Sequence, residues 1–252
     1  MDVAAYLDRL GLDRPAVADV AALRTLQERH LAVVPFENLS IHLGEPIVLD
    51  AEALFDKIVR RRRGGFCYEL NGLFAALLRE LGFDATLRSA KAFRPDGTLG
   101  APFDHAAIRV ELDEPWLADV GFGRFSRFPL RLSATEAQAD PDGEFLVLDA
   151  PYGDIDVLLD GAPQYRIEQR PRELDEFTPM AWWQSTSPDA HFTKGPTCSL
   201  PAKHGRITLA GEKLIVTTHG VREETRLSGD QEILDVYRKE FGIELDRVPG
   251  RP

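Results

Sequence analysis

The chain has 252 residues, a formal net charge of -11 and 44% hydrophobic residues, which is typical of a globular protein able to bury a large core. The acidic balance disfavours a nucleic-acid partner, because phosphate binding needs a basic face. No run of about 18 apolar residues occurs, so no membrane partner is expected. Two cysteines, Cys67 and Cys198, and a start without a basic leader predict a cytoplasmic protein without disulfides.

The first 85 residues predict a helical bundle. Apolar residues recur at helical spacing in three stretches, which are residues 2–10, 16–32 and 50–60. Asp50 is the expected N-cap of the third helix. Pro35 and Gly44 break the chain between the second helix and the third.

A fourth helix follows in the stretch RRRGGFCYELNGLFAALLRELG, where apolar residues recur at helical spacing from Leu70 to Leu81. Gly64 and Gly65 can take positive φ and turn the chain sharply, which would place Cys67 in the first turn. The unpaired amides of a helix start favour a thiolate. A lone cysteine is more often a small buried hydrophobe. Cys67 is therefore only a candidate nucleophile, and a catalytic role requires a base and an acid elsewhere in the chain.

From about residue 85 the pattern changes to short, partly alternating stretches punctuated by Gly, Pro and Asp, which predicts an antiparallel sheet or barrel. These stretches are residues 85–93, 105–112, 116–122, 129–132, 144–150 and 165–170. After Glu173 we expect an irregular segment that carries Trp182, Trp183 and His191. Residues 206–218 then predict a hairpin, and residues 230–242 predict a closing helix.

This order predicts an α+β fold in three parts. Residues 1–85 form the helical bundle that carries the nucleophile. Residues 86–180 form an antiparallel β-barrel, and residues 181–252 form a C-terminal α/β lid.

Two barrel residues can serve as partners of the cysteine. His105 heads a predicted strand, and Asp119 lies between Leu117 and Val120, where a carboxylate needs a compensating partner. A thiol, an imidazole and a buried carboxylate are the parts of a nucleophilic triad. If only one of the two were present, His105 would be interpreted as a structural histidine in a strand, or Asp119 as a structural aspartate in a turn.

Four sequence motifs are spread over nearly the whole chain. An RGG-x-C-x-E-x-N signature is formed by Arg63, Gly64, Gly65, Cys67, Glu69 and Asn71. PFENL runs from Pro35 to Leu39, D-V-G-F-G from Asp119 to Gly123, and WQSTSPDAHFT begins at Trp183. In these motifs and their order the chain resembles the arylamine N-acetyltransferases, in which a segment like the last one precedes the third domain.

The resemblance implies a papain-like core with Cys67, His105 and Asp119 as the catalytic triad. It also implies acetyl transfer from acetyl-CoA, through an acetyl-cysteine in a ping-pong reaction, to an arylamine, an arylhydrazine or a related aromatic amine. Such an activity belongs to xenobiotic metabolism. The expected partners are therefore a CoA thioester and a small aromatic amine.

The resemblance places Phe36 and Phe122 beside the nucleophile. Substrate binding is assigned to Phe36, Phe122 and Phe192, because aromatic faces stack on a flat ring. The resemblance places Asn71, Gly123 and Phe192 beside the cofactor. The CoA phosphates need local positive charge, for which the sequence offers Lys91, Arg94, Lys194, Lys203, His204 and Arg206, with Lys203 as the chosen contact. Asp104, directly before His105, would oppose them.

Arg63 and Glu37 are expected to form a buried ion pair, because the resemblance places the FENL segment beside the RGG turn. At least two of the residues from Arg60 to Arg63 should face solvent. Cys198 is expected in a loop, with a structural role, since no histidine or helix start is near it in sequence.

Three alternatives stay open. A thiol hydrolase or a transglutaminase-like amidase would use the same three residues. A zinc site could combine Cys67, Cys198 and His105, although no CxxC or HxxxH spacing supports it, and no metal is expected. A non-catalytic binding module is the third. The protein is expected as a monomer or homodimer, and its physiological acceptor is not specified by the sequence.

Overall fold

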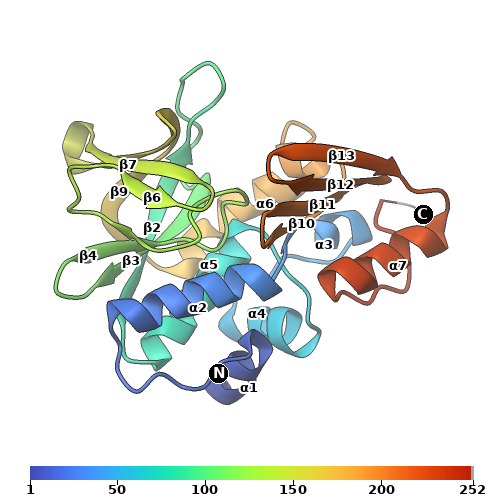
Figure 1. The fold of residues 1–252 in the computed structure, drawn as a ribbon, viewed down its shortest axis with the longest axis horizontal. Helices are drawn as coiled ribbons and strands as arrows, with labels where there is room; N and C mark the ends of the chain where they lie inside the picture. Colours follow the sequence, from blue (N-terminus) through green and yellow to red (C-terminus); the bar gives the residue numbers. More distant parts are fainter. Residues whose placement is uncertain (251–252) are drawn as a thin grey trace.

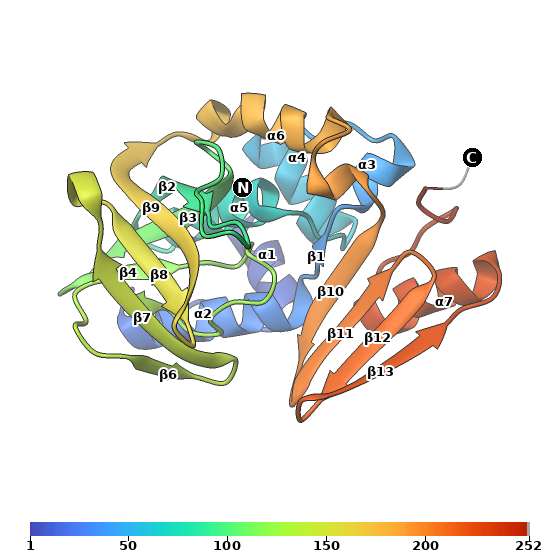
Figure 2. The ribbon, with the colours of Figure 1, turned by 90° about the horizontal axis from the view of Figure 1, so that it is seen from above.

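The computed structural model describes residues 1–250. Two antiparallel sheets lie at opposite ends of the molecule, with helices between and beneath them (Figures 1 and 2). The helices are α1 (Val3–Leu10), α2 (Val20–Val33), α3 (Leu39–Leu43), α4 (Ala51–Phe55), α5 (Cys67–Glu80), α6 (Thr178–Thr186) and α7 (Asp230–Phe241). Within residues 1–250, no helix has the length and apolar character needed to cross a bilayer.

The N-terminal helices begin at aspartate caps. Asp2 and Asp19 accept hydrogen bonds from the backbone three residues on, and the expected cap Asp50 accepts from Glu52 and Ala53. Because Asp19 fixes its start, α2 begins at Val20 and not at the expected residue 16. The expected helix 50–60 is confirmed as α4, continued by one wider π-helical turn.

Helix α5 is the centre of the largest core. It begins at Cys67, as expected, and its large apolar side chains Leu70, Leu73, Phe74, Leu77 and Leu78 are fully buried. Side chains from α1, α2 and α4 and from the first barrel strands pack around it. The α5 helix is therefore held on several sides, which fixes the position of its first residue.

The larger sheet is a nearly closed eight-stranded antiparallel barrel in the order β5-β4-β3-β2-β9-β8-β7-β6. Its strands are β2 (Asp84–Ala92), β3 (His105–Glu111), β4 (Pro115–Ala118), β5 (Leu130–Arg131), β6 (Gln138–Asp140), β7 (Gly143–Asp149), β8 (Ile155–Leu159) and β9 (Ala162–Arg172). The Gln138 side chain accepts from the backbone N–H of Arg131 and donates to its carbonyl, so the two edge strands meet. The expected barrel is confirmed.

The smaller sheet has the order β1-β10-β11-β12-β13, and α7 packs on it. Its strands are β1 (Phe36–Glu37), β10 (Thr197–Ala202), β11 (Gly205–Ala210), β12 (Lys213–Thr218) and β13 (Val221–Arg226). The expected hairpin and closing helix are confirmed as β11–β12 and α7. We call this sheet with α7 the C-terminal unit.

Two expectations for this region are wrong. The segment that carries Trp182 and Trp183 is the helix α6, which lacks a clear amphipathic period and has a proline near its start. Cys198 lies in strand β10, opposite Glu37 of β1, and not in a loop. That pairing joins segments far apart in the chain, so local sequence could not reveal it.

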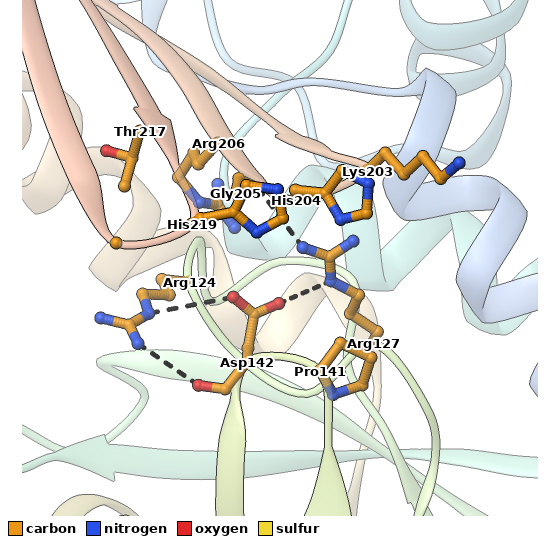
Figure 3. Close-up of a pocket in the computed structure, with 11 residues that line it drawn as sticks. Arg124, Arg127, Pro141, Asp142, Lys203, His204, Gly205, Arg206, Thr217 and His219 are labelled. Carbon is orange, nitrogen blue, oxygen red and sulfur yellow. Dashed lines mark hydrogen bonds and ion pairs between the residues drawn. The ribbon is translucent and has the colours of Figure 1, made fainter.

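The barrel and the C-terminal unit face each other across a cleft (Figure 3). Arg127 bridges it, since its guanidinium donates to Asp142 Oδ2 at 2.7 Å and to the carbonyls of Ala202 and Gly205 at 3.0 and 3.3 Å. This contact sets the spacing between the two sheets.

Candidate active site

Cys67, His105 and Asp119 are brought together from three elements. Cys67 begins α5, His105 begins β3, and Asp119 follows the last residue of β4. His105 Nε2 donates to Asp119 Oδ2 at 2.7 Å, which leaves Nδ1 as the ring nitrogen for the Cys67 sulfur. All three side chains are buried. The arrangement is that of a nucleophile, a base and an acid that orients the base.

The Asp119 carboxylate is held by four donors. Besides His105, Tyr165 donates its hydroxyl to Oδ2 at 2.9 Å, and Oδ1 accepts from Asn71 Nδ2 at 2.8 Å and from the Gly121 amide at 2.9 Å. Burial would raise the pKa of Asp119, but His105 and the hydrogen bonds hold it below its ordinary range. Asp119 is therefore a fixed carboxylate in a dry site.

The imidazole of His105 carries the positive charge that this carboxylate favours. Burial lowers the pKa of His105, but the charge of Asp119 and its hydrogen bond, followed by the Cys67 sulfur, outweigh burial and raise the pKa to about 10. At neutral pH the ring is thus an imidazolium between a carboxylate and a sulfur.

The two glycines of the turn before Cys67 are needed for space and not for positive φ. Neither Gly64 nor Gly65 takes positive φ, contrary to expectation. A Cβ on Gly64 would lie 1.9 Å from the carbonyl oxygen of Pro35, so only glycine lets the two backbones meet. The RGG turn is thereby fixed against the segment that leads into β1.

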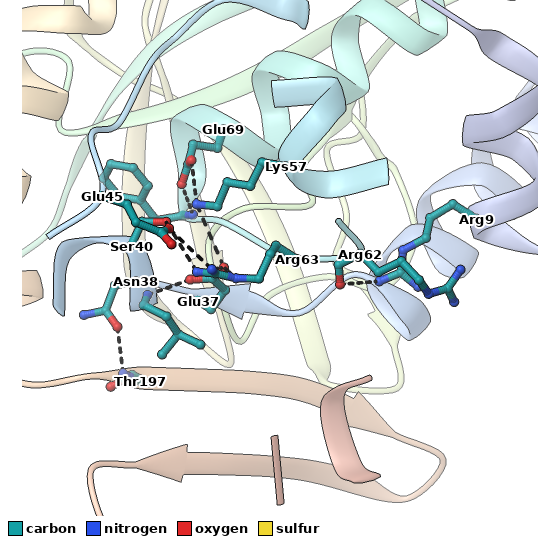
Figure 4. Close-up of polar contacts among 12 residues, drawn as sticks. Arg9, Glu37, Asn38, Ser40, Glu45, Lys57, Arg62, Arg63, Glu69 and Thr197 are labelled. Carbon is teal, nitrogen blue, oxygen red and sulfur yellow. Dashed lines mark hydrogen bonds and ion pairs between the residues drawn. The ribbon is translucent and has the colours of Figure 1, made fainter. Parts of the chain in front are cut away.

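A buried cluster of charges holds the start of α5 (Figure 4). The expected ion pair is confirmed, since Arg63 and Glu37 lie 3.0 Å apart and both are buried. Lys57 Nζ lies 2.7 Å from Glu69 Oε1, and Glu69 Oε2 accepts from the Phe66 amide at 3.2 Å. Each buried charge therefore has an opposite partner, and the cluster joins the RGG turn to the first turn of the helix.

A pocket of about 310 Å³ opens beside Cys67 and His105. Phe36, Phe122 and Phe192 all line it, so the structure brings the three expected substrate-binding side chains together. The Phe122 ring meets the His105 ring edge to face, with centroids 4.9 Å apart. We call this space the aromatic pocket. Its volume and its aromatic walls suit a flat ring near the sulfur.

Asn38 fixes one wall of the aromatic pocket. Its amide donates to the carbonyls of Phe192 and Gly195 at 2.8 and 3.0 Å, and its oxygen accepts from the Thr197 amide at 2.7 Å. The PFENL segment thus supplies one pocket residue, Phe36, and positions a second, Phe192.

Asn71 and Gly123 were both expected beside the cofactor. In the structure Asn71 lies in the protein core, and Gly123 lies next to a residue of the cleft. Asn71 is fully buried, and its amide donates to Asp119 and to the carbonyl of Ala106, while its oxygen accepts from the Val120 amide. This geometry gives no support for a cofactor contact and indicates that Asn71 positions Asp119. Gly123 is half-buried, and its carbonyl accepts from Arg206 at the edge of the cleft of Figure 3.

That cleft, of about 570 Å³, is lined by Arg124, Arg127, Lys203, His204, Arg206 and His219, with Asp142 as its acidic residue. We call it the basic cleft. It gathers three of the six cations expected to meet the phosphates, Lys203, His204 and Arg206. The other three lie elsewhere, since Lys91 pairs with Glu168, Arg94 lines the aromatic pocket and Lys194 donates to the carbonyl of Pro188.

The chain is similar in sequence to proteins of one known family. A family model described as N-acetyltransferase matches residues 19–249. The arylamine N-acetyltransferase of Mycolicibacterium smegmatis is 35% identical over 263 aligned positions, which cover 100% of this chain and 95% of that protein. The chain belongs to the arylamine N-acetyltransferase family.

Solved structures of the family have the same fold. The M. smegmatis arylamine N-acetyltransferase superimposes with a TM-score of 0.88, covering 97% of this chain and 93% of that one, at 35% identity. The Mycobacterium marinum enzyme, solved in complex with CoA, has a TM-score of 0.86 at 31% identity and covers 96% and 93%. The mixed helical and barrel architecture is therefore that of the family.

Several residues of the site were missed by sequence reasoning. Tyr165 reaches Asp119 from β9, and the Gln27 side chain on α2 accepts from the Asp119 amide and donates to the carbonyl of Ser126. Arg124 follows the D-V-G-F-G motif and could have been found from its charge. No sequence motif marks Tyr165 or Gln27, because they occupy ordinary strand and helix positions.

Among residues 1–250, no group of three metal-ligating side chains is close enough to hold a metal.

Proposed function

We propose that the protein transfers the acetyl group of acetyl-CoA to the nitrogen of aromatic amines or hydrazines through an acetyl-cysteine on Cys67. The observation that carries the proposal is the buried series Cys67, His105 and Asp119 beneath a pocket with aromatic walls. Family membership supports the same chemistry. The catalytic roles of the three residues, in a papain-like arrangement with the cysteine at a helix start, are part of this proposal.

In the first half-reaction the Cys67 thiolate attacks the carbonyl carbon of the thioester. The new sulfur–carbon bond forms as the bond to the CoA sulfur breaks, and the His105 imidazolium gives its proton to the departing CoA thiolate. The raised pKa of His105 means that this proton is in place before the reaction starts. Asp119 keeps the ring oriented throughout.

In the second half-reaction the amine nitrogen attacks the acetyl carbon on Cys67. His105, now neutral, takes a proton from that nitrogen, and Cys67 leaves as a thiolate, which restores the starting state. Phe36, Phe122 and Phe192 hold the aromatic ring of the acceptor. The Cys67 side chain is buried, which limits the access of water to the acetyl-cysteine before the amine arrives.

The basic cleft is the place proposed for the CoA phosphates. Lys203, Arg124, His204 and His219 line it, and Arg206 joins it to Gly123 and so to the loop that also carries Phe122. An acidic protein can bind a polyanion where positive charge is gathered locally. Phe192 and Gly123 are the proposed contacts nearer the thioester, and a CoA complex of the M. marinum relative is consistent with this ligand.

We propose that the domain bounds 1–85, 86–180 and 181–252 separate the nucleophile, its two partners and the cofactor lid. The two cysteines of the chain are unpaired, which supports a cytoplasmic protein. We also propose that it acts as a monomer or homodimer.

The test is acetylation of the protein by acetyl-CoA alone, followed by peptide mass analysis and steady-state kinetics with an arylamine. We expect one acetyl group on Cys67 and parallel double-reciprocal plots. Cys67→Ser should abolish both. Cys198→Ser is the matched control and should retain activity, because Cys198 is fully buried between β1 and β11 and burial raises its pKa well above the ordinary range.

Intersecting plots without acetyl-Cys67 would contradict the proposal. Hydrolysis of peptides or amides in place of acetyl transfer would instead identify the protein as a thiol hydrolase or a transglutaminase-like amidase.

A further inference from the structure

One wall of the aromatic pocket is polar, and the chemistry proposed above does not use it. Asp104, Arg94, Gln184 and His191 line the same cavity as Cys67 and the aromatic side chains. The aromatic walls account for a flat ring, but an unsubstituted ring would leave this polar wall without a partner. The polar wall therefore indicates that the acceptor carries a polar group in addition to its aromatic ring.

The Asp104 carboxylate is held in place from three elements. Gln184 of α6 donates to Oδ1 at 2.7 Å, and Gly100 of the β2–β3 loop lies directly against Oδ2. The Tyr68 hydroxyl of α5 donates to the backbone carbonyls of Phe103 and Asp104 at 2.8 and 3.1 Å. A carboxylate fixed in this way loses little conformational freedom when a ligand binds to it.

The charge of Asp104 is only partly compensated within the protein, because the charges of His105 and Arg94 act on it from nearby without a direct ion pair. No ion pair to Asp104 occurs in the described part of the chain, and its side-chain donor, Gln184, is neutral. Burial raises the pKa of the Asp104 carboxyl, while His105 and Gln184 oppose that effect. Arg94 lies on the same cavity but is exposed, and its guanidinium donates to the Thr98 hydroxyl at 3.3 Å. A cationic or N–H-bearing ligand group would compensate the half-buried carboxylate.

We propose that Asp104 is a specificity-determining residue that selects, among aromatic amines, those bearing a second cationic or hydrogen-bond-donating group, and that disfavours acceptors bearing a carboxylate. This inference rests on the proposed function, because it names the acceptor class of the same pocket. The acceptor then has two recognition points. Its ring lies among the aromatic side chains, and its second polar group meets Asp104.

The test compares three acceptors of similar size: para-(aminomethyl)aniline, which is cationic, aniline, which is neutral, and para-aminobenzoate, which is anionic. The ratio of kcat/KM for each charged acceptor to that for aniline removes general effects of a variant on catalysis. The variants are Asp104→Asn, which keeps an oxygen for Gln184, and Arg94→Gln, which removes the opposite charge from the same cavity.

We expect the wild-type preference for the cationic over the anionic acceptor to fall about tenfold in Asp104→Asn, as for the loss of one charge contact of roughly 1.4 kcal/mol. In Arg94→Gln the preference should rise. Gln184→Leu, which keeps the carboxylate charge but removes the hydrogen bond that fixes it, should lower the preference by a smaller factor than Asp104→Asn. This third variant keeps the test valid if Asp104→Asn fails to fold.

An unchanged ratio in folded Asp104→Asn would overturn the inference, and a change confined to Arg94→Gln would assign selection to Arg94 instead. Failure of the proposed function looks different, because wild-type protein would then form no acetyl-Cys67 with acetyl-CoA alone. The acetylation step is measured in each variant before any acceptor is added, so the two failures are distinguishable.

Discussion

At the scale of single residues, the charge on His105 makes stability depend on pH. Its pKa is raised from an ordinary value of 6.5 to about 10 by Asp119 and the Cys67 sulfur, against burial. A group whose pKa is higher in the folded state contributes stability that is complete below its unfolded pKa and is lost as pH rises through the folded pKa. The stabilisation should therefore decline between about pH 6.5 and about pH 10.

The measurement is the free energy of unfolding by urea for wild type and His105→Gln, from about pH 6 to about pH 10.5. The difference between them should shrink steadily over this range. In an Asp119→Asn background the pH dependence should largely vanish, since the main source of the raised pKa is gone. A difference that stays constant with pH would show that His105 is neutral in the folded protein.

The residues of the site were predictable where the sequence carries motifs. Cys67 follows a glycine turn, and Asp119 opens a short glycine-rich loop, so both stand out by position and chemistry. Tyr165 could not be predicted, because a tyrosine in an alternating strand is usually core, and only the closing of the barrel brings it to Asp119. Asn71 was recognised within a motif, but its burial against Asp119 needed the structure.

At the scale of elements, the start of α5 depends on the buried charges around Arg63. Arg63 is 4% exposed and lies between Glu37 and Glu45. Arg63→Ala leaves the buried Glu37 carboxylate with one charged partner, Lys57 at 3.9 Å, besides the backbone N–H of Leu39. Loss of one member of a buried ion pair costs about 3–5 kcal/mol, and a melting curve with calorimetric enthalpy would report it.

Arg61→Ala is the control for that variant. Arg60, Arg61 and Arg62 are exposed, as expected for the solvated part of this basic run, and Arg61 pairs with Asp56 at 3.0 Å. Exposed pairs contribute about 0–1 kcal/mol, so this variant should melt close to wild type. Equal losses of stability in the two variants would mean that the basic run stabilises the protein through its total charge and not through the burial of Arg63.

Helices and strands whose apolar residues recur at a clear spacing were predictable from the sequence. Elements fixed by contacts between distant parts of the chain were not. The helix from Cys67 and the hairpin β11–β12 follow from local spacing. Strand β10 is the opposite case, because its partner β1 has only two residues and lies in the N-terminal part of the chain. The start of α2 was misplaced because the apolar pattern extends before Asp19, whose cap decides the boundary.

At the scale of the whole molecule, the basic cleft lies between the barrel and the C-terminal unit, so cofactor binding should depend on salt. Lys203 and Arg124 are exposed, and exposed charges are screened within about 10 Å at 0.1 M salt. The acetyl-CoA KM should therefore rise with ionic strength. Lys203→Ala should raise KM at low salt by about threefold to tenfold and make its salt dependence shallower.

Lys213→Ala is the matched control, because Lys213 is equally part of the C-terminal sheet but pairs with Glu224 at 3.8 Å and does not line the cleft. Its KM should follow wild type at every salt concentration. If Lys203→Ala behaves in the same way as this control, the phosphates bind elsewhere and the basic cleft serves only to join the two sheets.

The pairing of β1 with β10 also orders events during synthesis on the ribosome. Phe36 and Glu37 emerge early, but their partners Ser199 and Cys198 follow only after the whole barrel has been made. Contacts between segments so distant in the chain form late, because the intervening chain must first be confined. Phe36 lines the aromatic pocket beside Cys67, so the growing chain contains Cys67, His105 and Asp119 before the wall of that pocket is complete.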